Sequence, residues 1–188
     1  PTILASDGSG VDFHQATGIV FTSHEILNGG TASMGSIAAP ITGRSMAAYL
    51  FEFNSGTDSI VFTNQTGSAV NNDIIESGMV IEQDIALLVN SNDTPHIVWR
   101  DASTHEINLA VQNGSSWDQT VLATDANGSQ FGAVMSENGS IGMMYRHDTS
   151  GLQTEWFEEA ADSWSVTEST ILSANETLID GDAIVQLS

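Results

Sequence analysis

The chain contains no cysteine, no lysine and no long apolar run. The absence of cysteine excludes a disulfide framework, a cysteine-held iron–sulfur cluster and a cysteine nucleophile. No segment reaches the roughly 18 apolar residues that a membrane-spanning helix needs. The sequence therefore predicts no insertion into a membrane.

Basic residues are nearly absent, because three arginines face 24 Asp and Glu residues and the formal net charge is −21. Such a surface repels nucleic acid and anionic membranes, which excludes both as expected partners. The acidic excess suits a marine or high-salt setting, or a surface that collects divalent cations, and it also suits solubility alone. The 40% hydrophobic content supports a buried core.

A repeat of about a quarter of the chain is the most informative pattern that is present. Val98-Trp99-Arg100 returns as Met144-Tyr145-Arg146 at an offset of 46. Two further positions return at an offset of 47, Leu109 as Trp156 and Trp117 as Trp164. Repeats of this length predict the blades of a β-propeller.

Short apolar or alternating runs separated by Gly, Asn, Asp and Ser clusters are typical of an all-β protein. In the third repeat unit we expect strands over 84–90, 96–101, 106–112 and 117–123. In the fourth we expect them over 130–136, 141–146, 152–158 and 164–169. Asn113-Gly114 and Asn138-Gly139 are predicted turns. Each unit is thus predicted to be a four-stranded antiparallel meander with a tryptophan at the start of its outermost strand.

The first two units are less regular. The second has expected strands over 36–41, 46–53, 59–63 and 72–76, and the first over 2–6, 18–22 and 25–27, without an innermost strand. The last residues, Asp182 to Ser188, resemble the innermost strands of the third and fourth units. We predict that they complete the first unit and close a ring, which removes an open sheet edge.

The predicted architecture is therefore a single four-bladed β-propeller of four-stranded antiparallel blades. Its blades are 1–30 plus 182–188, 34–77, 82–124 and 129–172. A fragment of a six- to eight-bladed ring, or a half-ring that dimerises, remains an alternative.

The third unit carries a recognisable sequence, Asn92-Asp93-Thr94-Pro95-His96 followed by Ile97-Val98-Trp99-Arg100-Asp101. With Ile-Asn-Leu-Ala and Gly-Ser-Ser-Trp after it, the unit resembles the propeller repeats of secreted bacterial and archaeal proteins. It is also distantly similar to the Asp-box repeats of sialidases. The resemblance implies a propeller fold and extracellular use, and it implies no particular reaction.

Two of the three arginines, Arg100 and Arg146, occupy one repeat position. They could bind an anionic sugar at one rim, or they could pair with neighbouring carboxylates such as Asp101 or Asp148. A recurrent repeat position favours the structural role. Because aromatic faces stack on sugars, we place a ligand site at Trp99, Arg100, Tyr145, Arg146 and His147.

Histidine and acidic residues offer two further kinds of site. No two of the five histidines have close metal-ligand spacing, and we expect His96 to be buried and hydrogen-bonded. The segment from Asp7 to Asp12, Asp-Gly-Ser-Gly-Val-Asp, resembles an acidic calcium-binding loop, with Asp7, Ser9 and Asp12 as candidate ligands. The same segment is equally typical of a turn, and we expect no cofactor to be required.

The sequence as a whole favours a non-enzymatic extracellular module that binds a glycan or a protein through one propeller rim. One alternative is a polysaccharide-active hydrolase or lyase with Glu52, Asp101 or Asp148 as acid and base. The other is a structural subunit of a surface layer, a fibre or a larger propeller. No residue is predicted to be catalytic in the favoured interpretation.

Overall fold

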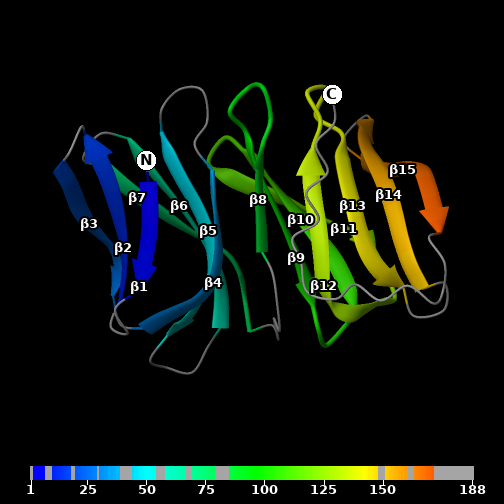
Figure 1. The fold of residues 1–188 in the computed structure, drawn as a ribbon, viewed down its shortest axis with the longest axis horizontal. Coiled ribbons are helices and arrows are strands. Elements are labelled where there is room, and N and C mark those ends of the chain that lie inside the picture. The colour runs from blue at the N-terminus through cyan, green and yellow to red at the C-terminus, as the bar shows by residue number, and fades with distance from the viewer. Residues whose placement is uncertain are drawn as a thin grey trace. The chain divides into compact units, whose positions relative to one another are not determined.

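A computed structural model describes residues 2–6, 10–17, 20–28, 30–38, 44–53, 58–66, 69–78, 85–147, 151–160 and 163–171. The chain divides into two compact units, Pro1–Val80 and Ile81–Ser188, which we call the first and second unit and which differ from the shorter repeat units of the sequence. In the described residues every regular element is a strand, and the strands pair antiparallel in four sheets (Figure 1). This confirms the predicted all-β class. None of the described segments is a helix of the length and apolar character that crossing a bilayer requires.

The first unit holds one three-stranded and one four-stranded sheet, each a meander in chain order. The three-stranded sheet consists of β1 (Thr2–Ser6), β2 (Gly10–Thr17) and β3 (Val20–Asn28). The four-stranded sheet consists of β4 (Gly30–Ala38), β5 (Ser45–Phe53), β6 (Asp58–Thr66) and β7 (Ala69–Ser77).

Three strand predictions in the first unit were wrong. The two strands expected over 18–22 and 25–27 form one strand, β3. Residues 10–17 form a strand that the sequence analysis missed, although Val11 and Phe13 alternate with polar residues as in a half-exposed strand. The innermost strand of the second sheet was expected over 36–41 but ends at Ala38. The sequence has Pro40 shortly afterwards, and proline lacks the amide hydrogen that a sheet ladder needs.

The core of the first unit lies along β5, which is buried from Ser45 to Phe51. Ala47, Tyr49 and Phe51 of β5 form one apolar cluster with Val61 of β6. The Tyr49 hydroxyl lies 3.0 Å from Oγ1 of Thr63, and burial raises the pKa of Tyr49 to about 12. The phenol therefore stays neutral and hydrogen-bonded within an apolar core.

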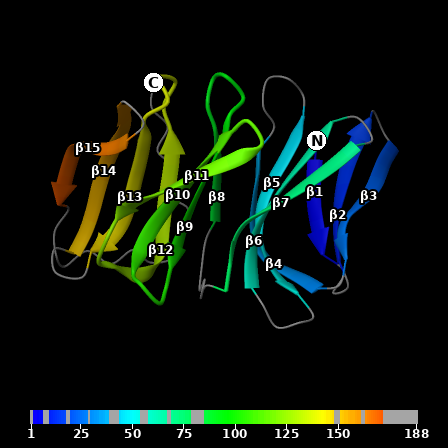
Figure 2. The ribbon, with the colours of Figure 1, turned by 180° about the vertical axis from the view of Figure 1, so that it is seen from behind.

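The second unit consists of two complete four-stranded meanders (Figure 2). The first has β8 (Ile85–Val89), β9 (Pro95–Asp101), β10 (Glu106–Asn113) and β11 (Ser116–Ala123). The second has β12 (Ala126–Met135), β13 (Ile141–His147), β14 (Gly151–Ala160) and β15 (Ser163–Ile171). All eight strands lie where the repeat predicted them, with ends that differ by a few residues. The predicted closing strand at 182–188 lies outside the described residues.

The repeat register is visible in the irregularities as well as in the strands. The ladder between the third and fourth strands shifts at Ile60/Val61 in one sheet and at Ile107/Asn108 in the next. Gly114 and Gly139 have φ angles of 64° and 91°, which is the left-handed conformation that the two Asn-Gly turns require. The two register shifts lie 47 residues apart, which is the repeat offset, whereas Gly114 and Gly139 lie in turns between different strand pairs of their sheets.

The two sheets of the second unit pack face to face through one apolar cluster. Val98, Ile107 and Leu109 of the first sheet contribute fully buried side chains. The second sheet contributes Phe131, Ile141, Met143, Tyr145 and Phe157. Fully burying one such side chain stabilises the fold by about 1.5–3 kcal/mol, so this interface accounts for much of the unit's stability.

Candidate functional site

The five predicted ligand residues do not share one accessible surface. Trp99, Arg100 and Tyr145 are buried, with 2%, 5% and 3% of their surfaces exposed. Arg146 is exposed and His147 is half-buried. Because side chains alternate along a strand, Tyr145 points into the interface between the two sheets while Arg146 points the other way.

Arg100 links the two sheets of the second unit. Its Nε atom donates a hydrogen bond of 2.6 Å to the backbone carbonyl of Ala126, the first residue of β12. The amide of Ala126 in turn donates to the carbonyl of His105 at 2.9 Å. The structural role that the repeat favoured for Arg100 fits this geometry, although its acceptor is a backbone carbonyl and not the carboxylate of Asp101.

Tyr145 also has a partner inside the protein. Its hydroxyl donates to Oε2 of Glu155 at 2.8 Å, and the other carboxylate oxygen accepts from Gln153 and from Ser169. Burial, and next the neighbouring carboxylate, raise the pKa of Tyr145 well above its usual range. The phenol is therefore a permanent donor to a buried carboxylate, and its ring is covered by the core.

The accessible groups near Arg100 form a continuous edge of the second unit, which we call the His105 rim. It consists of the turn 102–105, the link 124–126 and the end of β13 at Arg146 and His147. Ala126 joins these parts, because its backbone pairs with His147 and hydrogen-bonds to His105.

The backbone of the His105 rim is tightly specified. His105 and Asp125 have φ angles of 59° and 56°, which are uncommon for residues other than glycine. Asp101 accepts hydrogen bonds from the amide and the hydroxyl of Ser103, and its carbonyl accepts from the amide of His105 at 2.9 Å. Backbone strain of this kind is found mainly where the surrounding contacts determine the conformation, often at binding sites.

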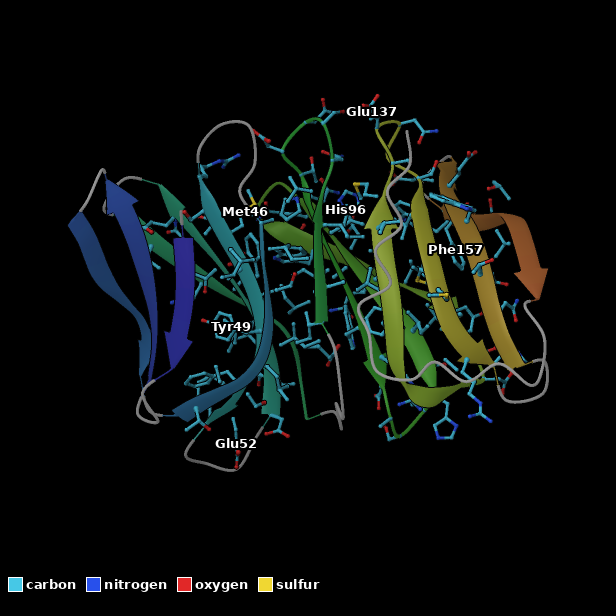
Figure 3. The ribbon with its side chains drawn as sticks, viewed as in Figure 1. Met46, Tyr49, Glu52, His96, Glu137 and Phe157 are labelled. Atoms are coloured by element: carbon cyan, nitrogen blue, oxygen red, sulfur yellow. The ribbon has the colours of Figure 1, made fainter. Side chains whose placement is uncertain are left out.

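The opposite edge of the same unit, which we call the Glu137 rim, consists of the turns 90–94, 113–116 and 136–140. Asn90 and Asn138 organise two of these turns, because their side-chain oxygens accept backbone amide hydrogens. Figure 3 shows Glu137 at the tip of the turn between β12 and β13. Asp93 and Glu137 give this rim acidic groups, and no arginine or histidine lies in its three turns.

His96 is buried as the sequence predicted, with 3% of its surface exposed. Its Nδ1 atom donates to the carbonyl of Thr94 at 3.0 Å, and its ring meets Trp164 edge to face at a centroid distance of 6.0 Å. Burial lowers the pKa of His96. This histidine therefore packs β9 against β15 as a neutral ring.

The predicted calcium and acid–base residues are spread over the chain. Asp7 and Ser9 lie outside the described residues, and Asp12 belongs to β2, where its backbone pairs with Ala5. Glu52 is exposed at the end of β5, and Asp148 lies outside the described residues. Within the part of the chain that the structure describes, no group of three or more His, Asp or Glu side chains is placed to hold a metal ion.

The sequence analysis missed the left-handed residues His105 and Asp125. Asp and His are among the residues that adopt positive φ most readily. The Thr-Asp pair at 124–125, directly after an apolar strand, was the available signal for a tight link at that point.

Comparison with known proteins assigns no family. No family model matches the chain, and no curated protein matches it. Among solved structures, it is similar to the WD40 domain of SCAP from fission yeast, with 9% identity and a TM-score of 0.38 over 97% of this chain and 55% of that one. It is also similar to the complex of the fission yeast SREBP–SCAP binding domains, with 10% identity and a TM-score of 0.36 over 95% of this chain and 64% of that one.

WD40 domains are β-propellers built from four-stranded blades. The chain spans less than two thirds of the length of either of these structures. At TM-scores this low, the fold assignment rests on the repeated four-stranded sheets themselves.

Proposed function

We propose that the chain is a non-enzymatic binding module that holds a segment of a partner protein against the His105 rim. The observation that carries this proposal is the backbone of the rim, which has two described non-glycine residues in the left-handed conformation, His105 and Asp125, against one in the Glu137 rim, Asp93. His105 hydrogen-bonds to Asp101 and Ala126, and Asp125 directly precedes Ala126, whose carbonyl accepts from Arg100. A preorganised surface loses little conformational freedom on binding, which favours affinity.

A protein ligand fits the described surface better than a glycan does. Sugar recognition uses exposed aromatic faces, whereas Trp99 and Tyr145 are buried and the large hydrophobic side chains exposed in the described residues are all aliphatic. The net charge of −21 attracts a basic partner and speeds its association. The extracellular setting and the calcium ion at Asp7, Ser9 and Asp12 are supported by the sequence alone, and they belong to this proposal.

The proposal includes the architecture that presents the rim, a four-bladed propeller closed by its C-terminal strand. Three described sheets have four strands each, and the sheet β1–β2–β3 has three. A fourth strand from Asp182–Ser188 would give that sheet the size of the others. Pairing two distant parts of the chain in one sheet would also hold the rim loops in a fixed arrangement.

The test is a selection of displayed peptides on the immobilised full chain, followed by affinity measurements on two matched variants. Thr124→Arg places a bulky cation at an exposed position of the His105 rim, and Ser115→Arg makes the same charge change at an exposed position of the Glu137 rim. We expect peptides to bind, Thr124→Arg to weaken binding about tenfold or more, and Ser115→Arg to leave it nearly unchanged.

Other outcomes would replace the proposal. Equal losses in the two variants, or no peptide selected, would contradict a binding site at the His105 rim. Saturable binding on a glycan array without turnover would identify a sugar-binding module. Cleavage of an acidic polysaccharide would select the enzyme alternative, and concentration-dependent filaments would select the structural subunit.

A further inference from the structure

The sheet β12–β15 has one covered face and one face that no described residue is seen to cover. The covered face carries Met143, Tyr145 and Phe157, which pack against the sheet β8–β11. On the other face, which we call the far face, the strand register places a second set of residues side by side. They are Gly132, Val134, Gly142, Met144, Arg146 and Trp156.

The far face is the repeat equivalent of a face that is fully buried one sheet earlier. Val98 pairs with Leu109 across β9 and β10, and its equivalent Met144 pairs with Thr154 across β13 and β14. Trp156 lies on the same face as Met144, opposite Gly142. Val98 and Leu109 are 0% exposed under the sheet β12–β15, whereas Met144 and Trp156 are half-buried. Arg100 is 5% exposed, and its equivalent Arg146 is exposed. The far face thus carries the kinds of residue that another sheet covers at the equivalent positions.

The Trp156 ring lies against Gly142 on this face. A Cβ atom added to Gly142 would lie 2.7–2.9 Å from three atoms of the Trp156 ring, so the ring contacts the backbone of β13 directly. An aromatic ring seated over a glycine gives this face apolar surface that another strand can cover.

The interface between the two sheets of the second unit indicates a role for Arg146. Arg100 reaches from its sheet to the next one and donates from Nε to the carbonyl of Ala126, where that sheet's innermost strand begins. Among the described residues, the Arg146 guanidinium has no such partner. A guanidinium at the same repeat position is placed to donate to the same kind of partner, a carbonyl at the start of an innermost strand.

The chain itself contains a copy of that partner. Ala126-Asn127-Gly128-Ser129 returns as Ala174-Asn175-Glu176-Thr177, and Gly132-Ala133-Val134 returns as Asp182-Ala183-Ile184. Ala174 follows Arg146 at nearly the separation at which Ala126 follows Arg100. The segment begins within three residues of the end of β15 at Ile171, so its reach to this sheet is not limiting.

We infer that the far face of the sheet β12–β15 is the docking surface of the chain's own C-terminal segment, residues 174–188, and that Arg146 secures it through a hydrogen bond from Nε to the carbonyl of Ala174. This inference rests on the proposed ring closure and adds the residue that secures the C-terminal segment. Arg146 then belongs to the closure of the fold, and His147 remains as the predicted ligand residue on the His105 rim.

The absence of cysteine makes a clean cross-linking test possible in the full chain. Met144→Cys with Ala183→Cys probes the inferred contact. Val98→Cys with Ala133→Cys is the matched control, because both residues belong to the described apolar interface at the equivalent positions. When each variant is refolded from urea under oxidising conditions, so that the thiols are accessible before they are buried, we expect both pairs to form a disulfide link within one chain, as peptide mapping by mass spectrometry would show.

The arginine is tested in the same background. Arg146→Met keeps an unbranched apolar stem and removes the donor, and we expect it to lower the yield of the Met144–Ala183 link several-fold. Arg44→Met removes an arginine of the first unit and should leave that yield unchanged. A Met144–Ala183 pair that fails to link while the control pair links would overturn the inference, and so would links between two chains, which would make a second copy the occupant.

Hydrogen exchange on the protein without cysteines gives an independent measurement. The amides of 183–187 should be protected in the natural chain and should exchange roughly tenfold faster in Arg146→Met. Unprotected amides, or equal exchange in both proteins, would contradict the docking. Neither measurement involves a binding partner. A negative result here therefore does not contradict peptide binding at the His105 rim, and a negative binding result does not contradict the docking of residues 174–188.

Discussion

Replacing Arg100 tests most directly how the repeated sheets of the second unit are joined. Arg100→Met keeps most of the apolar stem of the side chain and removes the Nε donor, whereas Arg100→Ala removes both. The donor makes a hydrogen bond of 2.6 Å to the Ala126 carbonyl, and the side chain is 5% exposed. Water therefore has little access to replace the lost partner.

The magnitude follows from these two facts. Leaving a buried carbonyl without a partner costs about 1–3 kcal/mol, so we expect Arg100→Met to lower the free energy of unfolding by about 2 kcal/mol. Arg100→Ala also removes roughly two buried methylene groups at about 0.8 kcal/mol each, which brings its expected cost to about 3.5 kcal/mol. The difference between the two variants measures the packing of the stem.

Urea unfolding followed by tryptophan fluorescence is the appropriate assay, because Trp99, Trp117, Trp156 and Trp164 all lie in the second unit. The signal therefore reports the unit that contains the bond. If Arg100→Met unfolds within about 0.5 kcal/mol of the natural chain, which is the size of an ordinary surface substitution, the bond to Ala126 does not join the sheets.

Three further substitutions and one deletion test other parts of the fold. Burial lowers the pKa of His96, so its neutral form stabilises the protein above pH 6.5, and that contribution is lost as the pH falls below 6.5. The urea midpoint of the natural chain should therefore fall when the pH is lowered from 7.5 to about 5.5. The midpoint of His96→Phe should fall less over the same range. Tyr145→Phe removes a donor to the buried Glu155 carboxylate and should cost about 1–3 kcal/mol, while an unchanged midpoint would mean that Gln153 and Ser169 suffice. Gly142→Ala forces the Trp156 ring to move, so a blue- or red-shifted tryptophan emission with a lower midpoint is expected, and an unaltered spectrum would refute the contact. Deleting Asp182–Ser188 should lower the thermal midpoint far more than trimming a free tail would, and an unchanged midpoint would refute ring closure.

The regular strands of the second unit were predictable because their signals are local. Alternation of apolar and polar residues marks each strand, and Asn113-Gly114 and Asn138-Gly139 mark two of the turns. The same reasoning failed at 10–17, where Asp12 and the preceding Gly-Ser-Gly resemble a loop although the segment is a strand. β2 is the central strand of its sheet, but Val11 and Phe13 are too few apolar residues to outweigh the turn-forming neighbours in a sequence pattern.

The candidate site was less predictable than the strands. Repeat equivalence placed Trp99, Arg100, Tyr145, Arg146 and His147 at the ends of β9 and β13, but it does not tell which side chains are covered. Tyr145 and Arg146 are adjacent in sequence, yet one is buried against the next sheet and the other is exposed. That difference depends on which face of the sheet has a neighbour.

The sequence by itself determined the all-β class, the length of the repeat, the four strands of each regular unit and the buried histidine, because these follow from side-chain periodicity and turn chemistry within a few residues. Only the tertiary structure decided that Arg100 joins two sheets through the Ala126 carbonyl, that Tyr145 serves a buried carboxylate, and that His105 and Asp125 adopt left-handed conformations. These features depend on contacts between residues that are ten or more positions apart or on a backbone held by such contacts, and the faces of two packed sheets must be in place before any of them exists.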